Sequence, residues 1–176
     1  MLADSEDPWA HLALGSVYLF GRRFDDSLAE FEAALRLNPN FSLAQGYHGL
    51  VLAYCGRWEE AVKAAQRALR LSPRDPLAAL YCGIGAYAHY VGRNYPEAQR
   101  LAREGIRQRG DFVGAHRTLT AAAGMAGEVD IAQAALKELR RVQPNISLDW
   151  IAKMMPIKQD VEREHYLEGF RRAGLE

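Results

Sequence analysis

The sequence has little that could hold together a very small fold or anchor a chain in a membrane. Only two cysteines, Cys55 and Cys82, occur among 176 residues, too few for the disulfide framework of a small secreted protein. We expect both to be small buried apolar side chains. No run of residues approaches the roughly 18 apolar residues of a membrane span, and no apolar stretch follows the acidic residues 1–7 as in a signal peptide. We therefore expect a cytoplasmic protein with no membrane partner.

Net charge is also absent. The 22 basic residues equal the 22 acidic residues, so no long-range field favours nucleic acid or an anionic surface. Helical-hairpin arrays that read RNA have a basic groove, and we expect no nucleic-acid partner here. We interpret the basic residues of one segment as a solvated outer face: Arg93, Arg100, Arg103, Arg107 and Arg109.

No motif of catalysis or of cofactor binding stands out. The chain contains no Ser-His-Asp arrangement, no phosphate-binding loop and no paired-carboxylate motif. Its five histidines are scattered, and we expect His11 and His116 to serve packing. Only His165 has close acidic neighbours, Glu162 and Glu164, and we interpret that group as a solvated helix face. We therefore expect a protein that is not an enzyme and needs no metal or cofactor.

What the sequence does contain is a repeat. Gly15, Gly49 and Gly83 are spaced by 34 residues, and Ser27 and Ala61 keep the same interval. Small residues recur later at 37 and then 34 residues, at Ala98 and Ala132. The period is thus 34 with one insertion of three. We place that insertion around residues 89–94, where it predicts a longer first helix or a bulged turn in the third unit.

The spacing predicts helical hairpins in which a small residue of one helix faces a bulky one of the other. Aspartate followed by proline opens first helices at Asp7-Pro8 and Asp75-Pro76. Prolines follow second helices at Pro39, Pro73 and Pro144, and glycines supply the turn within each hairpin at Gly21, Gly56, Gly92 and Gly127.

These residues resemble the tetratricopeptide repeat, whose pattern runs Trp, Leu-Gly, Tyr, then Ala, aromatic, Ala and Pro. The first unit matches at Leu14, Gly15, Tyr18, Phe24, Phe31, Ala34 and Pro39, and the second at Gly49, Trp58, Ala61, Ala68 and Pro73. The later units are looser, and the fourth has Thr120 in place of the packing glycine. The resemblance implies an all-α, right-handed superhelical solenoid of four antiparallel helix hairpins, at 8–41, 42–75, 76–112 and 113–146, after a flexible N-terminus at 1–7.

The remainder, 147–174, predicts two capping helices, the first opened by Ser147. We expect Trp150, Ile151, Met154 and Met155 to pack on the fourth hairpin, and residues 175–176 could be a cloning remnant. The segment HYLEGFRRAGL resembles the end of repeat domains in bacterial class III adenylate cyclases and winged-helix transcriptional regulators. That resemblance implies a regulatory part of a larger signalling protein.

The resemblance also implies a binding groove on the concave surface, lined by first helices. Projecting the family's groove positions onto this chain gives Trp9, Leu12, Ser16, Phe20, Tyr47, Leu50, Tyr54, Leu80, Tyr81, Ile84, Tyr87, Arg117 and Met125. Members that clamp a terminal carboxylate have lysine where this chain has Leu12 and Leu80, so we do not expect that clamp.

Three interpretations of so apolar a lining stay open. The groove receives an apolar peptide or an amphipathic helix of a protein partner, or some of these side chains are only core, or the chain forms a homodimer through this surface. The sequence alone does not separate them.

Overall fold

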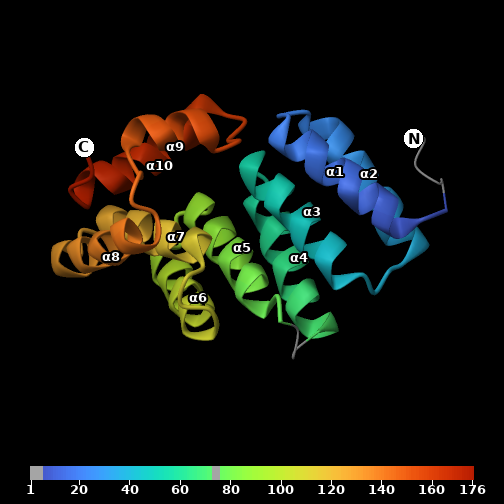
Figure 1. Ribbon diagram of the computed structural model, residues 1–176, viewed down its shortest axis with the longest axis horizontal. Helices are drawn as coiled ribbons and strands as arrows, with labels where there is room; N and C mark the ends of the chain where they lie inside the picture. Colours follow the sequence, from blue (N-terminus) through green and yellow to red (C-terminus); the bar gives the residue numbers. More distant parts are fainter. Residues whose placement is uncertain (1–5, 73–75) are drawn as a thin grey trace.

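A computed structural model describes residues 6–72 and 76–176, and within these ranges every regular element is an α-helix (Figure 1). The helices are α1 (Pro8–Phe20), α2 (Phe24–Leu37), α3 (Ser42–Tyr54), α4 (Trp58–Leu71), α5 (Ala78–Val91), α6 (Tyr95–Gln108), α7 (Val113–Ala126), α8 (Val129–Val142), α9 (Leu148–Met154) and α10 (Asp160–Arg172). The first eight pack as consecutive hairpins, α1 with α2 through α7 with α8. The predicted all-α array of hairpins is confirmed.

Two predicted helix starts have the expected caps. The Asp7 carboxylate accepts the Trp9 N–H at 2.9 Å, with Pro8 at the first helical position. The Ser147 hydroxyl accepts the Trp150 N–H at 3.1 Å and opens α9. The prediction that Pro76 opens a helix is wrong, because α5 begins only at Ala78. Asp75 and Pro73, named for the same connection, lie outside the described residues.

Small residues bring the two helices of a hairpin together. The buried Ser27 hydroxyl of α2 donates to the Gly15 carbonyl oxygen of α1 at 2.7 Å. In the second hairpin, a Cβ on Gly49 would lie 3.0 Å from the Cβ of Ala64, so the helices touch through their smallest side chains. A Cβ on Gly15 would also lie 3.0 Å from the Phe31 ring, so the predicted contact of a small residue with a bulky one is confirmed in the first hairpin, whereas Gly49 and Ala64 bring together two small residues.

The register of the third hairpin differs from the prediction. Each hairpin turn has one residue in the left-handed region: Arg22 (φ 60°), Gly56 (φ 81°), Arg93 (φ 62°) and Gly127 (φ 74°). Counting back seven residues from each gives Gly15, Gly49, Ala86 and Thr120, so Ala86 and not Gly83 is the third packing residue. Gly83 instead lies against the Phe112 ring at the start of α7.

Two of the three inserted residues therefore precede α5, and α5 itself is one residue longer than α1 and α3. The connection between α4 and α5 spans 72–77, whereas those between α2 and α3 and between α6 and α7 span only 38–41 and 109–112. The turn after α5 has the same length as the turn after α1. Of the two predicted alternatives, the bulged turn at 89–94 is wrong, whereas a first helix longer than α1 and α3 is found, by one residue. The insertion was placed too late because Gly83, a glycine inside α5, keeps the repeat interval without being the packing residue of its hairpin.

The terminal helices lie only partly as predicted. α10 packs on α7, and the segment before it crosses the turns of the first three hairpins, along one edge of the array (Figure 1). Arg22 donates to the Lys153 carbonyl oxygen at 2.6 Å, Lys158 N–H donates to the Tyr54 carbonyl oxygen at 3.0 Å, and Arg93 pairs with Glu162 at 2.6 Å. The predicted cap on the fourth hairpin is thus confirmed for α10, which packs on α7, and the terminal segment also contacts the turns of the first three hairpins.

The residues expected to anchor this cap are distributed differently. Ile151 and Met155 are buried and Trp150 is half-buried, but Met154 is 60% exposed. At the far end, Leu175 is buried and its N–H donates to the Phe170 carbonyl oxygen, so this residue is packed into the fold.

His165 of α10 does not lie on a solvated face, contrary to prediction. Its ring lies 4.7 Å from that of Tyr90 and its Nε2 lies 2.8 Å from the Tyr95 hydroxyl. Burial, helped by the charge of Arg93, lowers the pKa of His165 to about 4, so the imidazole is neutral at pH 7. Glu162 is engaged by Arg93, and the group serves to hold α10 in place.

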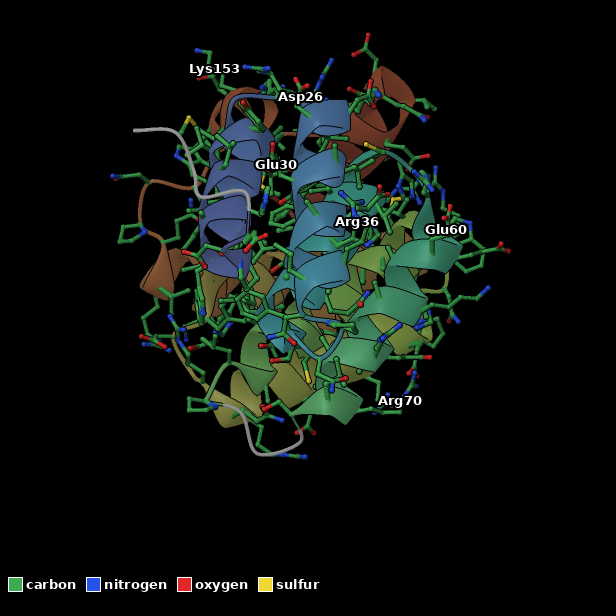
Figure 2. The ribbon with its side chains drawn as sticks, turned by 90° about the vertical axis from the view of Figure 1, so that its right-hand side faces the viewer. Asp26, Glu30, Arg36, Glu60, Arg70 and Lys153 are labelled. Atoms are coloured by element: carbon green, nitrogen blue, oxygen red, sulfur yellow. The ribbon has the colours of Figure 1, made fainter. Side chains whose placement is uncertain are left out.

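Second helices carry the charged outer face. Figure 2 shows charged side chains, Asp26 and Arg36 on α2 and Glu60 and Arg70 on α4 among them, projecting outward. Pairs along a helix neutralise one another, as for Arg100 with Glu97 at 2.6 Å. Arg103 donates to Gln99 and Arg107 pairs with Glu104, so these α6 arginines lie as predicted.

Candidate functional site

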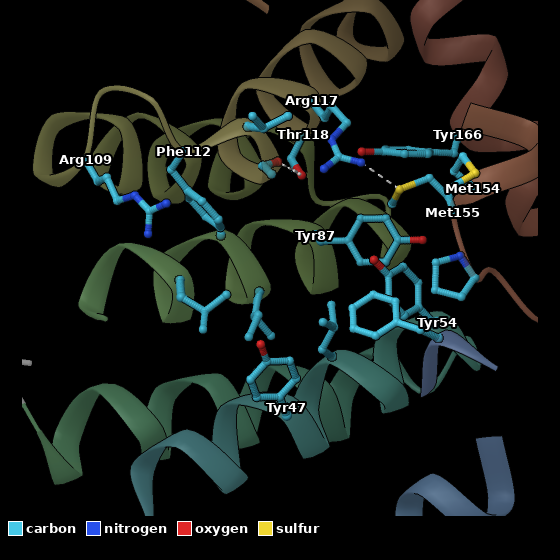
Figure 3. Close-up of a pocket in the computed structure, with 18 of the residues that line it drawn as sticks. Tyr47, Tyr54, Tyr87, Arg109, Phe112, Arg117, Thr118, Met154, Met155 and Tyr166 are labelled. Carbon is cyan, nitrogen blue, oxygen red and sulfur yellow. Dashed lines mark hydrogen bonds between the residues drawn. The ribbon is translucent and has the colours of Figure 1, made fainter. Parts of the chain in front are cut away.

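A cavity of about 470 Å³ lies on the side of the array formed by α3, α5 and α7 (Figure 3). First helices supply its floor and one wall because their apolar faces are wider than one neighbour can cover. The terminal segment closes it at one end. The lining residues are Phe20, Tyr47, Leu50, Tyr54, Leu80, Gly83, Ile84, Tyr87, Arg109, Asp111, Phe112, Val113, Gly114, Arg117, Thr118, Trp150, Met154, Met155, Pro156 and Tyr166.

Most of the groove residues expected from the sequence meet at this cavity: Phe20, Tyr47, Leu50, Tyr54, Leu80, Ile84, Tyr87 and Arg117. They come from α1, α3, α5 and α7, so one surface runs across all four hairpins.

The other expected groove residues lie away from the cavity lining. Trp9 is exposed and contacts the Phe41 ring at 4.6 Å, while Leu12 is buried. The Ser16 hydroxyl donates to the carbonyl oxygen one turn before it in α1. Tyr81 is fully buried, and Met125 packs on the core.

The closed end of the cavity is a cluster of tyrosines. The ring of Tyr87 lies 5.2 Å from that of Tyr54 and 5.3 Å from that of Tyr166, the latter edge to face. Burial raises the pKa of Tyr166 to about 12 and also raises the pKa values of Tyr54 and Tyr87. The phenols are therefore neutral hydrogen-bond donors across the physiological range.

Sequence reasoning missed the contribution of the terminal segment to this site. Trp150, Met154, Met155, Pro156 and Tyr166 all line the cavity, although the sequence assigned the first three only to a cap. The density of apolar and sulfur-containing side chains in this short segment was the available signal. No repeat spacing indicates where such a segment docks.

The open end carries one ion pair. Arg109, predicted on the outer face, instead lines the cavity beside Phe112 and pairs with Asp111 at 3.2 Å. In the same connection between α6 and α7, the Phe112 ring packs on Gly83 of α5.

Arg117 of α7 is the second cation of the cavity. Its Nη1 donates to the Met155 sulfur at 2.9 Å, and its guanidinium lies 5.2 Å from the Trp150 ring (Figure 3). Its Nε is buried without a hydrogen-bond partner. Among residues 6–72 and 76–176, no carboxylate pairs with Arg117.

Two exposed apolar side chains mark the rim. Phe20 is 67% exposed and Met154 is 60% exposed, and both border the cavity. Large apolar side chains held in water at the edge of an apolar cavity are typical of a surface that another molecule covers.

The described residues were also searched for metal ligands and for reactive side chains. Across the described part of the chain, no three His, Cys, Asp or Glu side chains are placed to hold a metal ion. Cys55 and Cys82 are buried, as expected, and burial raises the pKa values of both thiols. His116 is buried, as expected, with Nε2 2.9 Å from the Gly110 carbonyl oxygen. Within the described ranges, no helix is long and apolar enough to span a bilayer.

Comparison with known proteins agrees with this architecture. A family model described as "Tetratricopeptide repeat" matches residues 12–81. No protein of curated function matches the sequence.

Several solved structures share the fold. PilW, described as a widely conserved type IV pilus biogenesis factor, is 18% identical with a TM-score of 0.74, covering 93% of this chain and 76% of its own. TTC0263 of Thermus thermophilus, described as a thermophilic TPR protein, is 18% identical with a TM-score of 0.71, covering 95% and 90%. YrrB, described as a TPR protein with an unusual peptide-binding site, is 16% identical with a TM-score of 0.61, covering 97% and 86%. At these identities the likeness concerns the fold alone.

Proposed function

We propose that this chain, whose residues 12–81 match the tetratricopeptide repeat, is a non-catalytic protein-interaction scaffold that binds an apolar helix of a partner protein. The observation that carries the proposal is the apolar cavity with its exposed rim residues Phe20 and Met154. Apolar side chains of a partner would enter between Leu50, Leu80 and Ile84, whose walls are already preformed.

A helix suits this surface better than an extended strand. The stretch of wall between Tyr47 and Tyr87 is made of aliphatic side chains that offer no hydrogen-bond partners to a peptide backbone. A helix satisfies its own backbone and inserts only side chains, as in other helix-in-groove complexes. The peptide-binding site in the description of YrrB supports the choice of partner class, although the likeness to that protein is one of fold.

Site-specific photocrosslinking tests the proposal. A photoreactive amino acid replaces Phe20 at the rim or Leu80 at the open end, and in matched controls replaces Arg36 or Arg70, which project from the outer face (Figure 2). We expect the rim variants to crosslink to the apolar face of a helix in one partner protein, and the outer variants not to. Equal crosslinking from both faces would contradict the proposal.

Self-association is the second candidate, and a specific feature favours it. Trp9, Val17 and Phe20 are all at least 60% exposed and recur along one side of α1 at helical spacing. Such a stripe fits a second copy of the chain. Crosslinks from Phe20 only to another copy, together with a dimer in light scattering, would favour this candidate over a separate partner. The cytoplasmic location and the link to adenylate cyclases or winged-helix regulators stay predictions.

A further inference from the structure

We propose that the closed end of the cavity binds the carboxylate of a small apolar carboxylic acid, with Arg117 as the counter-ion. This inference does not rest on the proposed function, and the apolar part of such a ligand would compete with the side chains of a partner helix for the same wall. It rests on the surroundings of one arginine, on the volume of the cavity and on what its walls offer.

Arg117 is poorly satisfied where it lies. A guanidinium has five N–H donors, but its contact in the cavity is to a thioether sulfur, which is a weak acceptor. Its Nε is buried without a partner, and a buried donor left without an acceptor is costly. A carboxylate is the anion whose two oxygens match the spacing of two guanidinium N–H groups.

Phenols next to Arg117 can complete the site. Burial raises the pKa values of Tyr54 and Tyr166, and the positive charge of Arg117 opposes the rise at both. Both tyrosines also line the cavity that would hold the anion. Each neutral hydroxyl can donate one hydrogen bond to it.

The rest of the cavity suits the apolar part of such an acid. Its volume of about 470 Å³ falls in the range of about 300–1,000 Å³ that small-molecule sites occupy. Leu50, Leu80 and Ile84 line the same cavity as Arg117 and give it an aliphatic wall. An extended peptide buried along that wall would leave its amide groups without hydrogen-bond partners. An alkyl or aryl chain has no such groups.

Titration calorimetry with decanoate and decanol tests the inference, at concentrations below micelle formation. The two probes share a chain and differ in the charge of the head group. We expect wild-type protein to bind decanoate more tightly than decanol, and Arg117→Gln to lose about 10- to 100-fold in decanoate affinity, the range that charged hydrogen bonds contribute.

Two further variants separate charge from structure. Arg117 also contacts Met155 and Trp150, so unchanged decanol binding in Arg117→Gln reports an intact cavity. Arg117→Lys should retain part of the preference for decanoate, and Arg109→Gln, at the open end, should retain all of it. The inference is overturned if neither probe binds the wild type, if both bind it equally, or if Arg117→Gln binds decanoate as the wild type does.

Discussion

The main chain of α10 at Gly169 lies directly against that of α7 at Gly124. A Cβ added to Gly124 would overlap the Gly169 carbonyl oxygen, and one added to Gly169 would lie 2.6 Å from the Ala121 carbonyl oxygen. Neither neighbour is a side chain that could turn aside. This glycine pair therefore sets how closely the terminal helix approaches the array, and hence where Tyr166 enters the cavity.

Gly124→Ala should accordingly destabilise the protein. Forcing α10 away from α7 costs about 2–3 kcal/mol of unfolding free energy, the usual scale of overpacking. Urea denaturation followed by circular dichroism measures it. Gly110→Ala is the matched control, since the nearest atom to its new Cβ would be 3.9 Å away, and it should change stability by less than about 0.5 kcal/mol. Equal stability of the two variants would show that the contact between α7 and α10 can widen without cost.

Stability should fall as the solution is acidified through the range of histidine titration. Burial lowers the pKa of His48, against a smaller opposing effect of Glu32, and lowers that of His165 to about 4. Unfolded histidines titrate near about 6.5 and bind more protons than the folded ones between about 4 and 6.5. The stabilisation that comes from the lowered pKa values of these histidines is thus complete above about pH 6.5, and it is lost as the pH falls toward 4.

His48→Leu should flatten this dependence, because both ring nitrogens of His48 are buried without hydrogen-bond partners. Unfolding free energies measured at half-unit steps from pH 4 to 7 give the slope. If the unfolding free energy of His48→Leu depended on pH as steeply as that of the wild type, His48 would not contribute to the pH dependence.

Arg22→Gly should release α9 without unfolding the array. Arg22 holds a left-handed backbone conformation, φ 60°, which glycine adopts without strain, while its side chain donates to the carbonyl oxygens of Lys153 and Met155. Amide hydrogen exchange should therefore quicken in residues 148–154 and stay unchanged in α3 and α5. Arg23→Ala, which removes a surface pair with Asp26 and a contact with the Tyr18 ring but no contact with α9, should leave exchange in α9 as it is. Unaltered exchange in both variants would mean that Arg22 does not hold the segment.

The hairpins could be predicted from the sequence because their signals are local. Asp7 and Ser147 cap helices through residues two or three positions away, and Gly15 meets Ser27 only twelve positions later. The register of the third unit could not be predicted in this way. Gly83 keeps the repeat interval, but it makes room for the Phe112 ring and not for the second helix of its own hairpin. Spacing alone cannot distinguish a glycine that lets two helices of one hairpin approach from a glycine that admits an aromatic ring.

The closed end of the candidate site could not be predicted for a related reason. It depends on contacts such as Arg22 with Lys153 and Lys158 with Tyr54, each more than 100 positions apart in the chain. A repeat specifies how one unit packs on the next. It does not specify where a non-repeating segment docks, and so the surroundings of Arg117 became visible only in the folded protein.

The most direct test of the proposed binding surface is the affinity for the helical partner segment that crosslinking identifies, measured by calorimetry for wild type, Leu80→Glu and Arg36→Glu. Leu80 is half-buried at the open end, where a carboxylate would repel apolar side chains without entering the core, and Arg36 projects from the outer face. We predict that Leu80→Glu weakens binding by about 30-fold or more, the scale of an interface hot spot, and that Arg36→Glu leaves it unchanged. Full affinity in Leu80→Glu, with the fold intact by circular dichroism, would contradict the account.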